Sequence, residues 1–108
     1  MNFNKLLPLT ETTYYILLAL LEPLHGYGII LRVKALSAES VDIAPGTLYG
    51  ALENLRKQNL ISLVAEDAEK RRKIYALTDL GRQVLEMEYS RMKKLVELSQ
   101  PLLGGALQ

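Results

Sequence analysis

Apolar residues recur at helical spacing in the first half of the chain and predict three short helices. The first runs from about Thr10 to Leu21, and Pro23 ends it. A second opens at Gly26 and extends to about residue 38. The third begins near Pro45, because proline is favoured at the first helical position. The residues that should face a common core are Tyr14, Leu17, Leu18 and Leu21, then Ile29, Ile30, Val33 and Leu36, then Leu48, Leu52 and Leu55.

The second half changes to two short runs rich in Ile, Leu, Val and Tyr, which are typical of strands. These runs are Leu60–Ala65 and Arg72–Leu77, and the polar turn Glu66–Arg71 would join them in a hairpin. Asn59, which tolerates left-handed backbone, ends the helix before the hairpin. Thr78 is placed to cap a last helix after it.

The last helix is expected over about Asp79–Gln100, ending before Pro101, because the residue before a proline disfavours the helical conformation. Its apolar residues step by four and three, as in a coiled-coil seam. An amphipathic helix at the end of so short a chain has little of its own core left to cover, which predicts pairing with a second copy. We assign to this dimer interface Leu85, Tyr89, Met92, Leu95 and Val96.

Three compact helices, a hairpin and a long helix follow the element order of a winged helix-turn-helix. We therefore predict a mainly α fold of the α+β class. The winged helix-turn-helix domain would span residues 1–78, and residues 79–108 would form a C-terminal dimerisation helix and tail.

Composition excludes several kinds of site. The 108 residues include no cysteine and one histidine, His25, so disulfides, thiolate metal sites and serine–histidine relays are not expected. No paired carboxylates or phosphate loop indicate an enzyme, and we expect no cofactor or metal. There is no signal-peptide pattern, and the apolar run Ile16–Leu21 is too short to span a membrane. We expect a cytoplasmic protein.

The charge distribution is more informative than the net charge of +1. Four contiguous cations, Lys70–Lys73, lie where the hairpin turns. Strand alternation would place Arg71 and Lys73 on one side and Arg72 on the other, so that only part of the cluster could meet a ligand. The alternative is a solvated hairpin tip that charge protects from aggregation, which the acidic residues of segment 66–69 also allow.

Four sequence signatures resemble the PadR family of bacterial transcriptional regulators. They are ILLALLEPLHGYGI at Ile16–Ile29, GTLYGAL at Gly46–Leu52, RRKIYALT at Arg71–Thr78 and LGRQVL at Leu80–Leu85. They occur in the family's order, and the resemblance covers residues 10–85. The single C-terminal helix resembles the shorter of the family's two size classes.

The resemblance implies a homodimeric winged-helix repressor whose recognition helices enter successive major grooves of double-stranded DNA at an inverted repeat. Two departures stand out. Asn59 replaces a frequent family glycine, and the chain lacks the tryptophans with which some multidrug-sensing relatives sandwich flat drugs. A small aromatic or hydrophobic effector remains a partner to consider, and Tyr89, Met92 and Ser99 are the residues we place near its pocket.

The third helix and the basic turn supply the DNA-binding residues in this interpretation. The helix N-terminus would meet phosphate, Gly50 would allow close approach, and Asn54 could bond an adenine edge bidentately. The full set is Tyr27, Pro45, Gly46, Thr47, Tyr49, Gly50, Asn54, Lys57, Lys70, Arg71, Arg72 and Lys73.

Structural roles are the alternative for some of these residues: Tyr49 as a core aromatic, Thr47 as a helix cap, and His25 as a local cap of the second helix. The alternative function is a winged-helix module that binds proteins and makes no direct contact with DNA.

Overall fold

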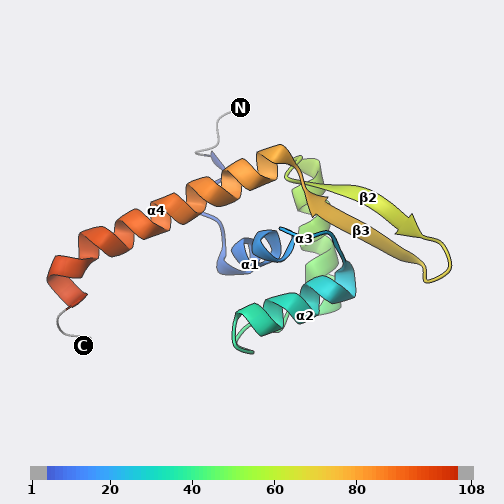
Figure 1. Ribbon diagram of the computed structural model, residues 1–108, viewed down its shortest axis with the longest axis horizontal. Coiled ribbons are helices and arrows are strands. Elements are labelled where there is room, and N and C mark those ends of the chain that lie inside the picture. Colours follow the sequence, from blue (N-terminus) through green and yellow to red (C-terminus); the bar gives the residue numbers. More distant parts are fainter. Residues whose placement is uncertain (1–4, 105–108) are drawn as a thin grey trace.

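The computed structural model describes residues 5–104, which form four helices and a small antiparallel sheet (Figure 1). In chain order the elements are α1 (Glu11–Ala19), β1 (Leu24–His25), α2 (Gly26–Leu36), α3 (Pro45–Lys57), β2 (Ile61–Asp67), β3 (Arg72–Leu77) and α4 (Asp79–Leu103). The hairpin of β2 and β3 extends from one side of the helical body, and α4 extends from the other (Figure 1). The predicted fold class, a winged helix followed by a long helix, is confirmed.

Local capping signals act as the sequence predicts. The Thr10 hydroxyl accepts a hydrogen bond from the Thr13 amide at 3.1 Å and caps α1. The Thr78 hydroxyl accepts from the Gly81 amide at 3.0 Å and donates to the Asn59 carbonyl at 2.6 Å. Asn59 itself has a φ of 61°, the left-handed conformation expected after α3. The start of α4 is therefore bonded to the turn that ends α3.

The sheet has the order β1-β3-β2, and its first strand was not predicted from the sequence. This strand is two residues long and pairs Leu24 with Tyr75 and His25 with Ile74. Two residues are too few to show alternation, so only the pairing with β3 reveals the strand. It brings the start of α2 to the edge of the hairpin.

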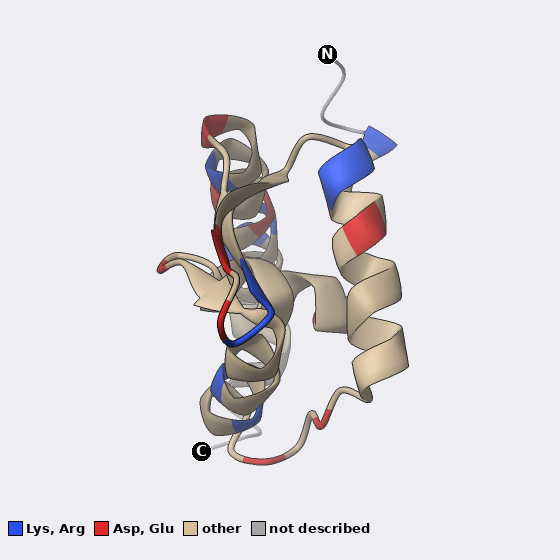
Figure 2. Cartoon of the chain, turned by 90° about the vertical axis from the view of Figure 1, so that its right-hand side faces the viewer, with Lys and Arg blue, Asp and Glu red and all other residues tan. Residues whose placement is uncertain are grey.

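A bulge in β2 sets the register of the hairpin tip. Pairing shifts between Leu63 and Ala65, and beyond the shift the cross-strand partners are Glu66 with Lys73 and Asp67 with Arg72. The acidic and basic residues of the tip thus lie on opposite strands (Figure 2).

The core fills the space between the three short helices, the sheet and the first part of α4. Its fully buried members include Ile16, Leu17, Ile29, Val33, Leu48, Leu52, Leu60 and Val84. Leu85 also belongs to this core and is 4% exposed. This corrects its assignment to the dimer interface: the Leu85 side chain is already covered by its own chain, because the beginning of α4 packs on the winged helix.

The last helix does not end before Pro101. It continues to Leu103, with Pro101 inside its last turn. A proline removes one backbone hydrogen bond and crowds the preceding turn. At Pro101 the helix surface is exposed, as the side chains of Leu102 and Leu103 show. Water can therefore solvate the backbone carbonyl group that lacks its hydrogen bond.

Candidate nucleic-acid interface

The outer face of α3 presents a bare backbone. Gly46 and Gly50 are exposed, and a methyl group added at either position would meet nothing within 4 Å. Lys57 follows seven residues after Gly50, so the three residues lie along one line of the helix. Leu48, Leu52 and Leu55 occupy the opposite, buried face. The helix is therefore anchored on one side and open to a large partner on the other.

The N-termini of α2 and α3 lack side-chain caps. His25 and Ala44 hold the two N-cap positions, and neither makes a capping hydrogen bond. The expected local cap at His25 and the cap alternative for Thr47 are thus incorrect. By contrast, threonines cap α1 and α4. Uncapped first-turn N–H groups, together with the helix dipole, favour binding of an anion.

Tyr49 connects α3 to the beginning of α2. A methyl group built on Gly26 would lie 2.6 Å from the Tyr49 hydroxyl oxygen, so a larger residue there would displace that ring. The Tyr49 side chain remains 53% exposed, which rules out the core alternative. The phenol therefore lies at the positive end of α2 and at the surface.

The basic turn differs from a regular strand. Arg71 precedes β3 and has a φ of 54°, so strand alternation starts only at Arg72. The expectation that Arg71 and Lys73 share one side by alternation is therefore wrong. The Lys70 amide donates to the Asp67 carboxylate at 3.2 Å, which closes the turn.

A hollow of about 440 Å³ lies where the basic turn meets the two uncapped helices. Its lining comes from His25, Gly26 and Tyr27 at the start of α2, from Tyr49 on α3, and from Arg71–Lys73 and Tyr75 on the hairpin. Burial raises the pKa of the Tyr75 phenol; nearby Arg56 opposes this rise, whereas Tyr49 and Glu53 add to it. Five of the predicted DNA-binding residues thus surround one hollow: Tyr27, Tyr49, Arg71, Arg72 and Lys73.

The remaining predicted residues lie outside this hollow. Pro45, Gly46, Thr47, Gly50 and Lys57 are exposed along α3, and Lys70 is exposed in the turn. Asn54 is exposed but lines a different hollow, of about 290 Å³, with Leu6, Leu9 and Thr13. Its side chain therefore borders the N-terminal segment, away from the hairpin.

Sequence reasoning missed Arg56 and Tyr75. Arg56 is exposed and follows Tyr49 by seven residues, which places it on the hairpin side of α3. That spacing was a usable signal. Tyr75 carried no such signal, because an aromatic residue in a strand predicts only packing.

The outer half of α4 carries an exposed apolar surface, which we call the α4 stripe: Tyr89, Leu95, Val96, Leu98, Leu102 and Leu103. Within residues 5–104, two of the predicted effector residues line separate hollows. Tyr89 lines a hollow with Tyr14 and Leu21, whereas Ser99 lines another with Leu95 and Leu103. Ten residues of helix separate Tyr89 from Ser99 by about 15 Å.

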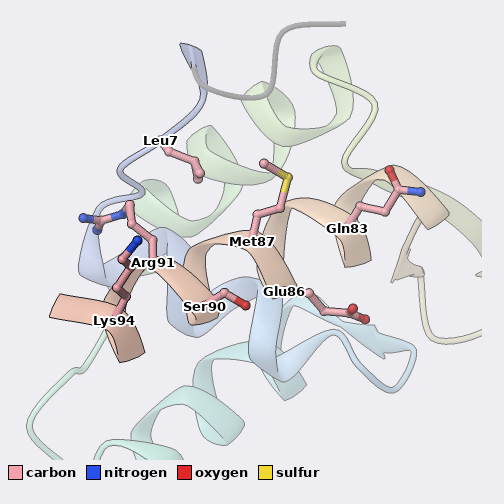
Figure 3. A pocket seen from close by; sticks show the side chains of 7 residues that line it. All are labelled: Leu7, Gln83, Glu86, Met87, Ser90, Arg91 and Lys94. Atoms are coloured by element: carbon pink, nitrogen blue, oxygen red, sulfur yellow. The ribbon is translucent and has the colours of Figure 1, made fainter. Parts of the chain in front are cut away.

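A further hollow, of about 690 Å³, runs along another face of α4 (Figure 3). Leu7 of the N-terminal segment lies across it from α4 residues that include Met87, Ser90 and Lys94 (Figure 3).

Within residues 5–104, no helix is long and apolar enough to cross a membrane. Over the same residues, no cluster of metal-binding side chains is present.

Comparison with known proteins identifies relatives. The family profile described as "Transcriptional regulator PadR-like family" matches residues 16–87. The transcriptional regulator YqjI of Escherichia coli (strain K12) is 31% identical over 85 residues, 78% of this chain and 40% of YqjI. The chain spans less than half the length of the curated relatives it matches, 20% and 40% for two of them.

Solved structures agree with this comparison. A PadR-like transcription factor from Bacteroides fragilis has a TM-score of 0.70 and 30% identity, covering 84% of this chain and 88% of that one. A PadR family transcriptional regulator from Eggerthella lenta DSM 2243 has a TM-score of 0.69 and 29% identity, covering 85% and 80%.

Proposed function

The chain belongs to the PadR-like family of transcriptional regulators, which are not enzymes, and from this premise we propose that it is a homodimeric repressor of an inverted-repeat operator. One observation carries the DNA-binding role: the uncapped N-terminus of α2, Tyr49 of α3 and three cations of the hairpin converge on one hollow. Residues 1–78 would bind the DNA, and residues 79–108 would hold two copies together.

In this proposal each α3 enters a major groove, and each basic turn contacts the phosphate backbone nearby. Gly46 and Gly50 let the helix backbone approach the base edges, because no side chain projects there. Lys57 and the hairpin cations neutralise phosphates, which contributes affinity without sequence preference. Two half-sites about one helical turn apart would match a two-fold dimer.

Changing Arg71 and Lys73 together to alanine is expected to weaken binding to the DNA upstream of the protein's own gene. A dimer would lose four cations, so the slope of log affinity against log salt should fall by about 2 to 4. Fluorescence anisotropy across a salt series measures both quantities, and footprinting of the wild type gives the half-site spacing.

The matched control changes Lys93 and Lys94 to alanine. It removes equal charge from α4, which extends away from the hairpin (Figure 1). An unchanged affinity and salt slope in the Arg71 and Lys73 variant would refute the role of the hairpin.

One observation favours a second candidate, a winged-helix module that binds proteins. Glu66 and Asp67 face Lys73 and Arg72 across the hairpin, which lowers the positive potential at the tip. Such a module would bind its partner with little dependence on salt and would not retain genomic DNA.

The α4 stripe supports the dimer. Val96 is 63% exposed, and its neighbours on the stripe form an apolar face that one chain leaves uncovered. A bound effector that prefers a different angle between protomers would lower DNA affinity by shifting the population. We place such a hydrophobic effector between the two copies of α4, near Tyr89, Met92 and Ser99.

Val96→Glu is expected to convert the dimer to a monomer at micromolar concentration, because it would bury a charge in an apolar interface. Ser90→Glu adds the same charge on the other side of α4 and should leave the dimer intact. Light scattering coupled to size exclusion measures the mass of each. A monomeric wild type, or equal masses for the two variants, would contradict the dimer.

A further inference from the structure

A buried tyrosine on the hairpin has an unused hydrogen-bond donor. Tyr75 is 5% exposed, and among residues 5–104 its hydroxyl makes no hydrogen bond. Every fully buried side-chain polar atom in that part of the chain does have one. The Tyr75 oxygen must therefore reach solvent. Because Tyr75 lines the hollow between the hairpin and α2, we take the oxygen to reach solvent there.

The groups that line this hollow suit an anion. Arg71, Arg72 and Lys73 line the same hollow and supply positive charge. The first turn of α2, which has no side-chain cap, also lines it. The Tyr49 hydroxyl, placed against Gly26, adds a second phenol donor.

Resting on the proposed function, we propose that this hollow is a socket for one phosphate of the DNA backbone, with the Tyr75 hydroxyl as a neutral donor to it. A phosphodiester has one negative charge and two non-bridging oxygens, so it can accept from the phenols and the cations together. On α3, the charges of Arg56 and Glu53 both act on the Tyr75 phenol in opposite directions, and that of Arg56 acts more strongly.

The socket would set the position of the hairpin relative to the helices. Its donors come from α2, α3 and β3, three elements that a single phosphate would bridge. Phosphate contacts of this kind fix the register of a protein on the duplex. Tyr75 would thus act in positioning and would carry no base specificity.

Tyr75→Phe tests the socket, because it keeps the ring in the core and removes only the oxygen. Affinity for the upstream DNA should fall about tenfold, the effect of losing a hydrogen bond to a charged group. The salt slope should not change, since no charge is lost. Tyr15→Phe, the same change on half-buried Tyr15 of α1, should leave the affinity as it is.

A methylphosphonate scan of the operator identifies the phosphate. One substitution per half-site should weaken the wild type and have little effect on Tyr75→Phe, because the two changes remove the same hydrogen bond. If the Arg71 and Lys73 variant loses affinity whereas Tyr75→Phe binds like the wild type, the socket is wrong and the repressor proposal stands. The socket would also be overturned if, at every phosphate, the affinity lost by methylphosphonate substitution simply added to the affinity lost by Tyr75→Phe. A wild type that binds no DNA would overturn both proposals.

Discussion

Gly81→Ala is expected to destabilise the protein by about 3 kcal/mol, an estimate from overpacking of a close contact together with loss of a helix cap. A methyl group on Gly81 would lie 1.9 Å from the Leu60 carbonyl oxygen and 2.9 Å from its carbon. Backbone atoms cannot rotate away as a side chain can, so either α4 or the turn at Leu60 must shift.

The turn at Leu60 is held on both sides. Its amide donates to the Leu55 carbonyl at 3.0 Å, and its carbonyl accepts from the Thr78 amide at 3.1 Å. Moving α4 outward would instead break the bond of 3.0 Å between the Gly81 amide and the Thr78 hydroxyl. Small domains are stable by about 5–15 kcal/mol, so the loss is a large share of the total.

Urea unfolding followed by circular dichroism measures this loss. Gly50→Ala is the matched control, since the same methyl group meets nothing within 4 Å. Only the higher helix propensity of alanine then changes the stability, so the free energy of unfolding of this control should rise by up to about 1 kcal/mol. Equal midpoints for Gly81→Ala and the wild type would contradict the close packing of α4 on Leu60.

Glu88→Gln is expected to cost about 2–3 kcal/mol at neutral pH, somewhat less than breaking a fully buried ion pair, because the Arg91 side chain is 38% exposed. Glu88 is 1% exposed, and its carboxylate accepts from the Leu9 amide at 2.6 Å. The Arg91 guanidinium donates to both carboxylate oxygens, at 3.2 Å for its Nη2 atom. Glutamine keeps one oxygen acceptor and replaces the other with an NH2 group, which donates, so either the Arg91 guanidinium or the Leu9 amide would face a donor.

The pH dependence identifies the charge as the cause. The hydrogen bond from Arg91 lowers the pKa of Glu88, burial opposes this, and the Leu9 amide lowers it further. A carboxyl with a lowered folded-state pKa stabilises the fold above its ordinary value of 4.5 and loses this contribution as pH falls through the folded value. The difference between wild type and Glu88→Gln should therefore shrink in acid.

Unfolding by urea at pH 7 and at a series of acid pH values gives this difference. Glu86→Gln is the control: its carboxylate pairs with Arg82 at 2.9 Å on the exposed surface of the same helix. Exposed pairs contribute at most about 1 kcal/mol. A difference between wild type and Glu88→Gln that stays constant with pH, or equal effects of the two substitutions, would refute the buried charge.

The acidic and basic residues of the hairpin show how far sequence reasoning reached. The contiguous cations Lys70–Lys73 and the acids before them were visible in the sequence. Their pairing was not, because the bulge between Leu63 and Ala65 sets which residues face each other. Nor was the left-handed backbone at Arg71, which places that side chain outside the alternation of the strand.

By itself, the sequence determined the order of the four helices and the hairpin, the caps at Thr10 and Thr78, the left-handed turn at Asn59 and the start of α3. Each of these depends on residues within about one helical turn of each other, which a linear pattern records. Only the tertiary structure decided that Leu85 is core, that β1 exists, and that Tyr49 and Tyr75 meet the start of α2 around one hollow. These outcomes arise from packing between segments far apart in the chain, which no local spacing encodes.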